Sequence, residues 1–245
     1  MDPKKLYSEH CFGDFGDKTP GHQHLVHFLQ SVPDKHNVIL IDVGCGAGYW
    51  MKFAERIGFA KELIIGIDQS SSGTEALSSE GYSVIAGDIE HIKCNDNIAD
   101  VVMSNGVIHH TKNSKKAFSE ICRITKPGGL IMISVYNIWN PYFWIVHRAT
   151  YPLRWIYWNL SRKILPFLSF LLWPLANAGA LFSHGIWIKD FSKVQVLVAD
   201  QVLTPYAELF TKNKLLELGI LNDLENIHDG FVKRMFMRYA VFRKK

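Results

Sequence analysis

Short apolar runs alternate with amphipathic stretches through the first half of the chain. Five such runs lie at residues 37–43, 62–68, 82–88, 99–105 and 128–136. Their length and composition predict strands buried in a sheet. Segments with helical spacing lie between them, at residues 50–58, 70–81 and 113–129. This alternation predicts βαβ units and a parallel sheet with right-handed crossovers.

The regular alternation stops after residue 136 for about fifty residues. It resumes with a predicted helix at 211–219 and two strand-like stretches at 219–229 and 233–245. A further helix is expected at 24–32, ahead of the first strand. The pattern therefore indicates one α/β unit with a long insertion near its fifth strand.

Composition agrees with a globular protein and narrows its class. The chain has 245 residues, of which 48% are hydrophobic and 20% charged, and its net charge is +4. This charge is too small to indicate nucleic acid by itself. The four cysteines are scattered without a CxxC pair, which favours reduced thiols over a disulfide framework or a zinc site. The first residues lack the apolar segment of a secretory signal, so we expect a cytoplasmic location.

A glycine cluster, "DVGCGAG" at residues 42–48, follows the first predicted strand. Its glycines allow a tight turn and let a ligand lie against bare backbone at the edge of the sheet. The spacing is GxGxG, and Tyr49 stands where the dinucleotide fingerprint GxGxxG has its third glycine. The Lys-Ser or Lys-Thr pair of a P-loop does not follow. The cluster alone is weak evidence for any one ligand.

Acidic residues close the next two predicted strands. Asp68 ends the second strand, where a carboxylate can accept hydrogen bonds from both hydroxyls of a ribose. Asp88 ends the third, where it can accept from the exocyclic amine of an adenine. Taken singly, Asp68 could instead cap the serine-rich helix after it, and Asp88 could be a turn residue. The order of glycines and acids along the chain favours a cofactor site.

This ordered set resembles the class I S-adenosylmethionine-dependent methyltransferases, and most closely the small-molecule enzymes of quinone and natural-product pathways. The similar segments span residues 37–136: "DVGCGAG", "GIDQS", "AGDIEHI" and "SNGVIHHTKNSKKAFSEICRITKPGG". The resemblance implies S-adenosylmethionine as cofactor and S-adenosylhomocysteine as product. It implies contacts from the glycine turn to the methionine part, from Asp68 to the ribose, and from Asp88 with Ile89 to the adenine. The full predicted cofactor set is Asp42, Gly44, Cys45, Gly46, Gly48, Asp68, Gln69, Asp88, Ile89 and Asn105.

The resemblance also implies a Rossmann-like, doubly wound sheet of seven mostly parallel strands with an antiparallel last strand. We therefore divide the chain into an N-terminal lid segment (1–36), a cofactor-binding core (37–137), an aromatic and basic insertion (138–190) and a C-terminal completion of the sheet (191–245). DNA and RNA amino-methyltransferases usually carry an Asp/Asn-Pro-Pro-Tyr-type motif at the fourth strand. This chain has "SNGV" there, so we do not expect a nucleic-acid partner.

Methyl transfer from a sulfonium is an in-line displacement in which the protein aligns the acceptor and, where needed, removes its proton. His109 and His110 follow the fourth predicted strand and are the candidate bases. We favour His109, because adjacent residues of an extended stretch point to opposite sides. The alternative is that either histidine only packs the loop. His22, His24 and His27 lack a nearby carboxylate or cysteine, so no metal site is predicted.

The insertion holds six of the seven tryptophans and five Lys or Arg residues against one acid, Asp190. Residues 164–182 carry no charge, although Pro166, Pro174, Asn177 and Gly179 interrupt them. Three interpretations remain open: a substrate cap, an interfacial membrane anchor or a homodimer interface. A spanning helix is disfavoured, because the chain would have to leave and re-enter one domain. We favour a cap that also contacts the membrane surface.

The sequence thus predicts methyl transfer to an O, N or C atom of a small, hydrophobic or lipid-like acceptor. Candidate substrate contacts are Tyr136, Trp139 and Tyr206, and candidate lid residues are Tyr7, Phe12 and Phe15. The rival interpretations are a nicotinamide-dependent oxidoreductase and a membrane-associated binding protein that keeps the fold without turnover.

Overall fold

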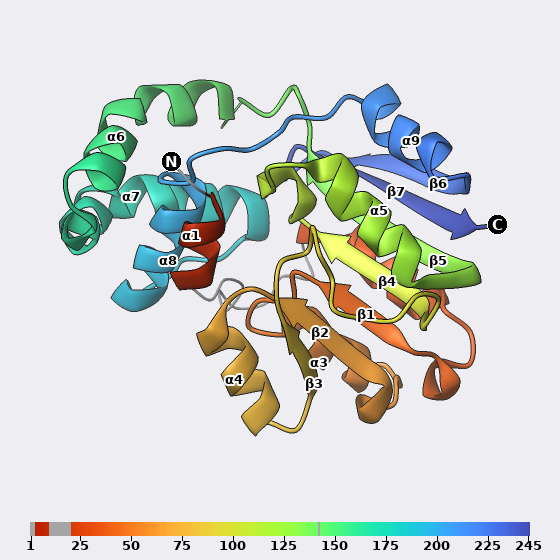
Figure 1. The fold of residues 1–245 in the computed structure, drawn as a ribbon. Coiled ribbons are helices and arrows are strands. Elements are labelled where there is room, and N and C mark those ends of the chain that lie inside the picture. Colours follow the sequence, from red (N-terminus) through yellow and green to blue (C-terminus); the bar gives the residue numbers. More distant parts are fainter. Residues whose placement is uncertain (1–2, 10–20, 142) are drawn as a thin grey trace.

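A seven-stranded sheet forms the centre of the computed structural model, which describes residues 3–9, 21–141 and 143–245. The strand order is β3-β2-β1-β4-β5-β7-β6 (Figure 1). The strands are β1 (Leu40–Val43), β2 (Ile64–Asp68), β3 (Ser83–Ala86), β4 (Ala99–Asn105), β5 (Thr125–Tyr136), β6 (Leu224–Val232) and β7 (Met237–Lys244). β7 runs antiparallel to β5 and β6, whereas β1 to β5 pair in parallel. This topology confirms the predicted fold class.

Helices cover both faces of the sheet, because neighbouring residues of each buried strand point to opposite sides. Ile41 and Val43 belong to one apolar cluster, and Leu40 belongs to the other. The first cluster includes residues of α5 (Ser114–Ile124) and α9 (Lys212–Leu221). The second includes residues of α2 (Gln23–Ser31), α3 (Tyr49–Arg56) and α4 (Ser71–Ser79). The observed sheet is thus doubly wound, as predicted.

The structure corrects the start of one predicted strand. The stretch 219–229 was expected to be a strand from its first residue, but α9 continues to Leu221 and β6 starts at Leu224. Gly219 does not end the helix. It lies against the ring of Phe242, where an added Cβ would come within 2.4 Å of a ring carbon. The glycine therefore permits close packing of α9 on β7.

Four helices form a separate layer beyond the carboxyl ends of the parallel strands (Figure 1). This helical layer consists of α1 (Pro3–Glu9), α6 (Tyr151–Asn159), α7 (Leu165–His184) and α8 (Phe191–Gln201). It has its own apolar cluster, which includes Leu6, Tyr157, Leu168, Val194 and Leu203. The layer therefore continues beyond residue 190, where the sequence suggested that the sheet would resume, and it includes part of the N-terminal segment.

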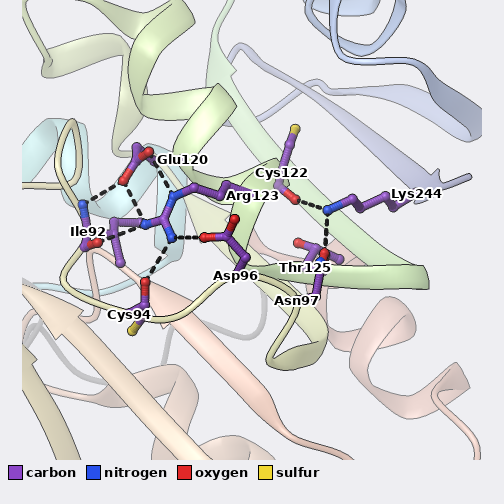
Figure 2. Close-up of polar contacts among 9 residues, drawn as sticks. All are labelled: Ile92, Cys94, Asp96, Asn97, Glu120, Cys122, Arg123, Thr125 and Lys244. Atoms are coloured by element: carbon purple, nitrogen blue, oxygen red, sulfur yellow. Dashed lines mark hydrogen bonds and ion pairs between the residues drawn. The ribbon is translucent and has the colours of Figure 1, made fainter.

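A polar network attaches the loop that joins β3 and β4 to helix α5 (Figure 2). The Arg123 guanidinium donates to the carboxylates of Glu120 and Asp96 and to the carbonyls of Ile92 and Cys94, at 2.6–3.0 Å. The Lys244 ammonium donates to the carbonyls of Cys122 and Thr125 at 2.8 Å. The Arg123 bonds hold a long loop without regular structure, and the Lys244 bonds tie β7 to the junction of α5 and β5.

Candidate active site

A cavity opens at the carboxyl ends of the parallel strands, between the sheet and the helical layer. This is where doubly wound sheets bind ligands. It contains about 1060 Å³ of empty space when its open mouth is included. The predicted cofactor residues that line it are Gly44, Cys45, Gly46, Asp68, Gln69, Asp88, Ile89 and Asn105. Asp42 and Gly48 are absent from the lining formed by the described residues; Asp42 is buried within β1, and Gly48 is the N-cap of α3.

The glycine turn brings bare backbone to the cavity wall. Gly44, Gly46 and Gly48 have φ angles of 82°, 52° and 75°, a region that side chains disfavour. A Cβ on Gly44 would lie 2.3 Å from a methyl carbon of Val107. The amides of Gly44 and Cys45 donate to the Ile67 carbonyl at 2.7 and 3.1 Å, which holds the turn on β2. Glycine is therefore required at position 44 for both its backbone angle and its space.

Asp68 is anchored beside this turn. Its carboxylate accepts from the Gly46 amide at 2.8 Å and from the Ser70 amide at 2.8 Å. Burial raises the pKa of the carboxyl group above its ordinary value, and these amide bonds oppose the rise. The N-cap of α4 is Ser70, whose hydroxyl accepts from the Gly73 amide. Capping therefore does not explain Asp68, and its remaining lone pairs can accept ligand hydroxyls.

Asp88 lines the cavity and also makes a hydrogen bond within its own turn. One of its carboxylate oxygens accepts from the Glu90 amide at 3.0 Å, so the turn interpretation also holds. The neighbouring Glu90 was missed by the sequence analysis. Its carboxylate accepts from the amides of Lys112 and Asn113 at 3.0 and 3.2 Å. Glu90 thereby ties the segment after β4 to the loop that carries Asp88.

Asn105, the last residue of β4, lines this cavity, and its side chain carries a buried acceptor that lacks a partner within the described residues. Its Oδ1 atom has no hydrogen-bond partner among residues 3–9, 21–141 and 143–245. A buried acceptor without a donor is costly and calls for an explanation. A ligand ammonium or hydroxyl would supply the missing donor. Together with Asp68 and the glycine turn, Asn105 fits a ligand with an amino acid end and a ribose.

The structure corrects the choice between the two histidines. His109 is fully buried, and its ring centroid lies 4.0 Å from that of Tyr136. Neither of its ring nitrogens has a partner in the described part of the chain, and burial lowers its pKa well below the ordinary value. The predicted extended stretch is instead a 3₁₀ turn, Ile108–His110. This turn directs His109 into the core and leaves His110 at the cavity.

His110 has the features of a base. Its Nδ1 atom lies 3.2 Å from the Tyr206 carbonyl, which can only accept, so Nδ1 carries the proton in that bond. Nε2 then keeps its lone pair, and within the described residues no bond to it is found. Burial lowers the pKa of His110, while the negative charge of Asp200 opposes this effect. The ring is therefore neutral at neutral pH.

The helical layer contributes two further lining residues, Tyr7 and Asp200. The Tyr7 hydroxyl donates to Asp200 Oδ1 at 3.2 Å, and it lies 3.2 Å from the Thr204 hydroxyl. Its ring centroid is 5.2 Å from that of His110. Tyr7 lines the cavity, as a lid residue or by ordinary packing, and its lid role stays a prediction, whereas Phe12 and Phe15 lie outside the described residues. Asp200 was missed because nothing in "VLVADQV" distinguishes it from a solvated residue of a helix.

The three predicted substrate residues lie away from the cavity wall as far as the structure describes it. Tyr136 packs on His109. Trp139 is 76% exposed to solvent. Tyr206 is also exposed and supports the site only through its backbone carbonyl, which bonds His110. Direct contact of these three side chains with an acceptor therefore stays a prediction, and none of them belongs to the cavity lining formed by the described residues.

The N-terminal histidines are used in packing. His24 Nε2 lies 3.0 Å from the Ser134 hydroxyl, and burial lowers the pKa of His24 to about 4. The ring of His22 stacks on that of His24 with 5.9 Å between centroids. Among the residues that the structure describes, no three His, Cys, Asp or Glu side chains are grouped for a metal ion.

Comparisons with known proteins agree with this geometry. Residues 41–133 match the model of a methyltransferase domain family. A malonyl-[acyl-carrier protein] O-methyltransferase of Buchnera aphidicola is 25% identical over 208 residues, which cover 78% of this chain and 77% of that protein. A tRNA (carboxymethyluridine(34)-5-O)-methyltransferase of Arabidopsis thaliana is 32% identical over 112 residues, and that match covers 44% of this chain and 26% of the relative.

A solved structure shows the same fold over nearly the whole chain. It is an S-adenosylmethionine-dependent methyltransferase from Mesorhizobium loti, with a TM-score of 0.57 and 14% sequence identity. The match covers 91% of this chain and 98% of that one.

Proposed function

Because the chain belongs to the class I S-adenosylmethionine-dependent methyltransferases, we propose that it methylates an oxygen, nitrogen or carbon atom of a small hydrophobic acceptor. One observation carries this proposal. The cavity has a wall of glycines and acids from the sheet, and an opposite wall with Tyr7 and Asp200 from the helical layer. The first wall suits the cofactor, and the second is the place for an acceptor.

The sheet wall fits S-adenosylmethionine, which is the cofactor of this family. Asp68 would hold the ribose hydroxyls, Asp88 with Ile89 would border the adenine, and Asn105 would accept from the ammonium group. The bare glycine turn leaves room for the methionine part. When bound, the cofactor supplies a methyl group made electrophilic by the positive sulfur.

The protein's own part in the reaction is to orient the acceptor and take its proton. His110 Nε2 is the acceptor of that proton, since Nδ1–H is engaged with the Tyr206 carbonyl. The lowered pKa of His110 keeps Nε2 unprotonated at neutral pH. Tyr7 lies beside His110 and helps to exclude water from this side of the cavity.

Apolar side chains in the lining of the cavity support a hydrophobic acceptor. Tyr49, Trp50, Val107 and Tyr7 line the cavity together with its acids. A large polar substrate would leave these side chains in contact with its hydrogen-bonding groups, which costs free energy. An acceptor with an apolar body and one reactive polar atom matches this lining.

The test uses tritium in the methyl group of S-adenosylmethionine and a graded set of acceptors. Phenols, carboxylic acids and amines with octyl tails are compared with their ethyl counterparts, and with an acyl carrier protein and tRNA. We expect label in the organic phase for an octyl compound and much less for its ethyl counterpart. An Asp68→Ala control should lower the label about 10- to 100-fold when the cofactor is below saturation. Label that appears only on the carrier protein or the tRNA would overturn the proposed acceptor class.

A further inference from the structure

Helix α7 presents an apolar face to solvent. Its exposed side chains recur at helical spacing: Phe167, Phe170, Leu171, Pro174, Leu175, Ala178, Leu181 and Phe182. Phe167 and Phe170 are 68% and 71% exposed. The opposite face is also apolar and is buried in the helical layer, through Leu168, Leu172, Ala176 and Ala180. A helix that is apolar all round belongs in a core or in lipid, and α7 has only one side in a core.

The packing of α7 favours a position along a membrane rather than across it. The stretch Arg162–Phe182 is long and apolar enough to span a bilayer, with a mean hydropathy of 1.6, and a third of its apolar window is buried inside the protein. The buried Asn177 accepts from the Ile188 amide at 2.5 Å and so ties α7 to the segment before α8. One side of the helix is therefore occupied by protein, and the outer side is left for another apolar medium.

Cations flank this face on both sides along the chain. Arg162 and Lys163 precede α7, and Lys189 and Lys193 follow it. Arg162 lies over the ring of Trp158 and Arg148 over the ring of Trp144, each at 4.5 Å from the centroid. Arg162 directly precedes α7, and tryptophan beside arginine next to an apolar surface is the arrangement expected at lipid headgroups.

We propose that the outer face of α7 docks this enzyme on an anionic lipid bilayer, with the helix lying in the plane of the interface. A second copy of the chain is the rival occupant. Residues 138–190 carry five cations and one acid. Arg154 is buried, and the other four cations (Arg148, Arg162, Lys163 and Lys189) reach solvent. A symmetric interface would set this basic surface against itself. An anionic surface complements the same charges. Docking is independent of the proposed acceptor, because it can be measured without cofactor or acceptor.

The experiment is flotation of the full chain with vesicles. We compare phosphatidylcholine alone with phosphatidylcholine containing phosphatidylglycerol, at low and high salt. The protein should float with the anionic vesicles at low salt and largely leave them at high salt, because the Debye length shrinks. A double variant, Phe167→Ser and Phe170→Ser, should lower the partition coefficient onto anionic vesicles about tenfold or more, since apolar burial drives insertion. Arg162→Glu with Lys163→Glu should lower it by at least about tenfold.

A matched variant controls for loss of exposed apolar residues in general. Ile220 and Leu221 on α9 are also exposed, and their replacement by serine should leave flotation unchanged. Circular dichroism shows that each variant is folded. Wild-type protein that stays unbound with anionic vesicles would overturn the proposal. A dimer in light scattering that the Phe167 and Phe170 changes convert to a monomer would also overturn it. An equal loss of flotation in the α9 control would do the same.

Discussion

The sheet edge and the helical layer face the same cavity but are built in different ways. At the sheet edge, Asp68 and the glycine turn are held by backbone hydrogen bonds from neighbouring strand ends. In the helical layer, Tyr7 and Asp200 reach the cavity because whole helices pack on an apolar cluster. Local motifs therefore specify the sheet wall of the cavity, whereas tertiary packing specifies its helical wall. Changes to each wall should affect different measurements.

The largest effect on activity is expected at His110, the proposed base. His110→Ala should lower kcat about 10²- to 10⁴-fold, because general base catalysis supplies a factor of that size. The affinity for S-adenosylhomocysteine should stay unchanged, as measured by calorimetry. His109→Phe keeps a ring stacked on Tyr136 and should retain most activity. If the His109 variant lost activity and the His110 variant kept it, the assignment would be reversed.

The pH dependence provides a second check on His110. Its pKa is lowered in the folded protein, and only the neutral ring can accept a proton. Activity should therefore stay level as pH falls through 7 and decline only below the ordinary histidine value of about 6.5. A profile of kcat/KM against pH measures this limb. A decline centred above that value would contradict a neutral, buried base.

A smaller effect is expected at the glycine turn. Gly44→Ala forces a side chain into a left-handed conformation and against Val107. Such strain costs about 1–3 kcal/mol and is relieved by displacement of the turn. The affinity for S-adenosylhomocysteine should therefore fall about 5- to 150-fold. Gly87→Ala is the control, since an added Cβ there meets no atom within 4 Å among the described residues. Equal losses in both variants would show that the turn has no special role.

The smallest effect is expected at the polar network that holds the loop between β3 and β4 on α5. Arg123→Ala removes bonds to two carboxylates and two carbonyls in the network of Figure 2. Because the side chain is partly exposed, we expect a loss of about 1–2 kcal/mol in the free energy of unfolding, measured with urea. Arg243→Ala breaks an exposed pair with Glu225 and should change it by less than about 0.5 kcal/mol. A larger loss for Arg243 would contradict this ranking.

The difference between the two walls also explains what could be predicted. Local patterns mark the strands, the glycine turn, Asp68 and Asp88. The strands form one sheet, and the turn and both acids lie together at its edge. The comparisons confirm the methyltransferase fold and cofactor. These findings favour methyl transfer over the nicotinamide-dependent and non-catalytic alternatives.

Other features depended on tertiary structure. The preference for His109 assumed an extended stretch, and the 3₁₀ turn reversed it. Asp200 became a site residue only because α8 packs on α7 and returns the chain to the cavity. Trp139 stood out in sequence as one of many rings, but its position beyond β5 leaves it in solvent. Periodicity shows which residues form a helix, and it does not show where that helix packs.

The division of the cavity into two walls can be tested by titrating S-adenosylhomocysteine into two variants by calorimetry. Asp68→Ala removes a carboxylate from the sheet wall, and Asp200→Asn changes the charge of the helical wall while keeping an acceptor for Tyr7. We predict that Asp68→Ala weakens binding about 10- to 100-fold, as the loss of charge-assisted hydrogen bonds implies. Asp200→Asn should bind like the wild type. Unchanged affinity in Asp68→Ala, or an equal loss in both variants, would contradict the account.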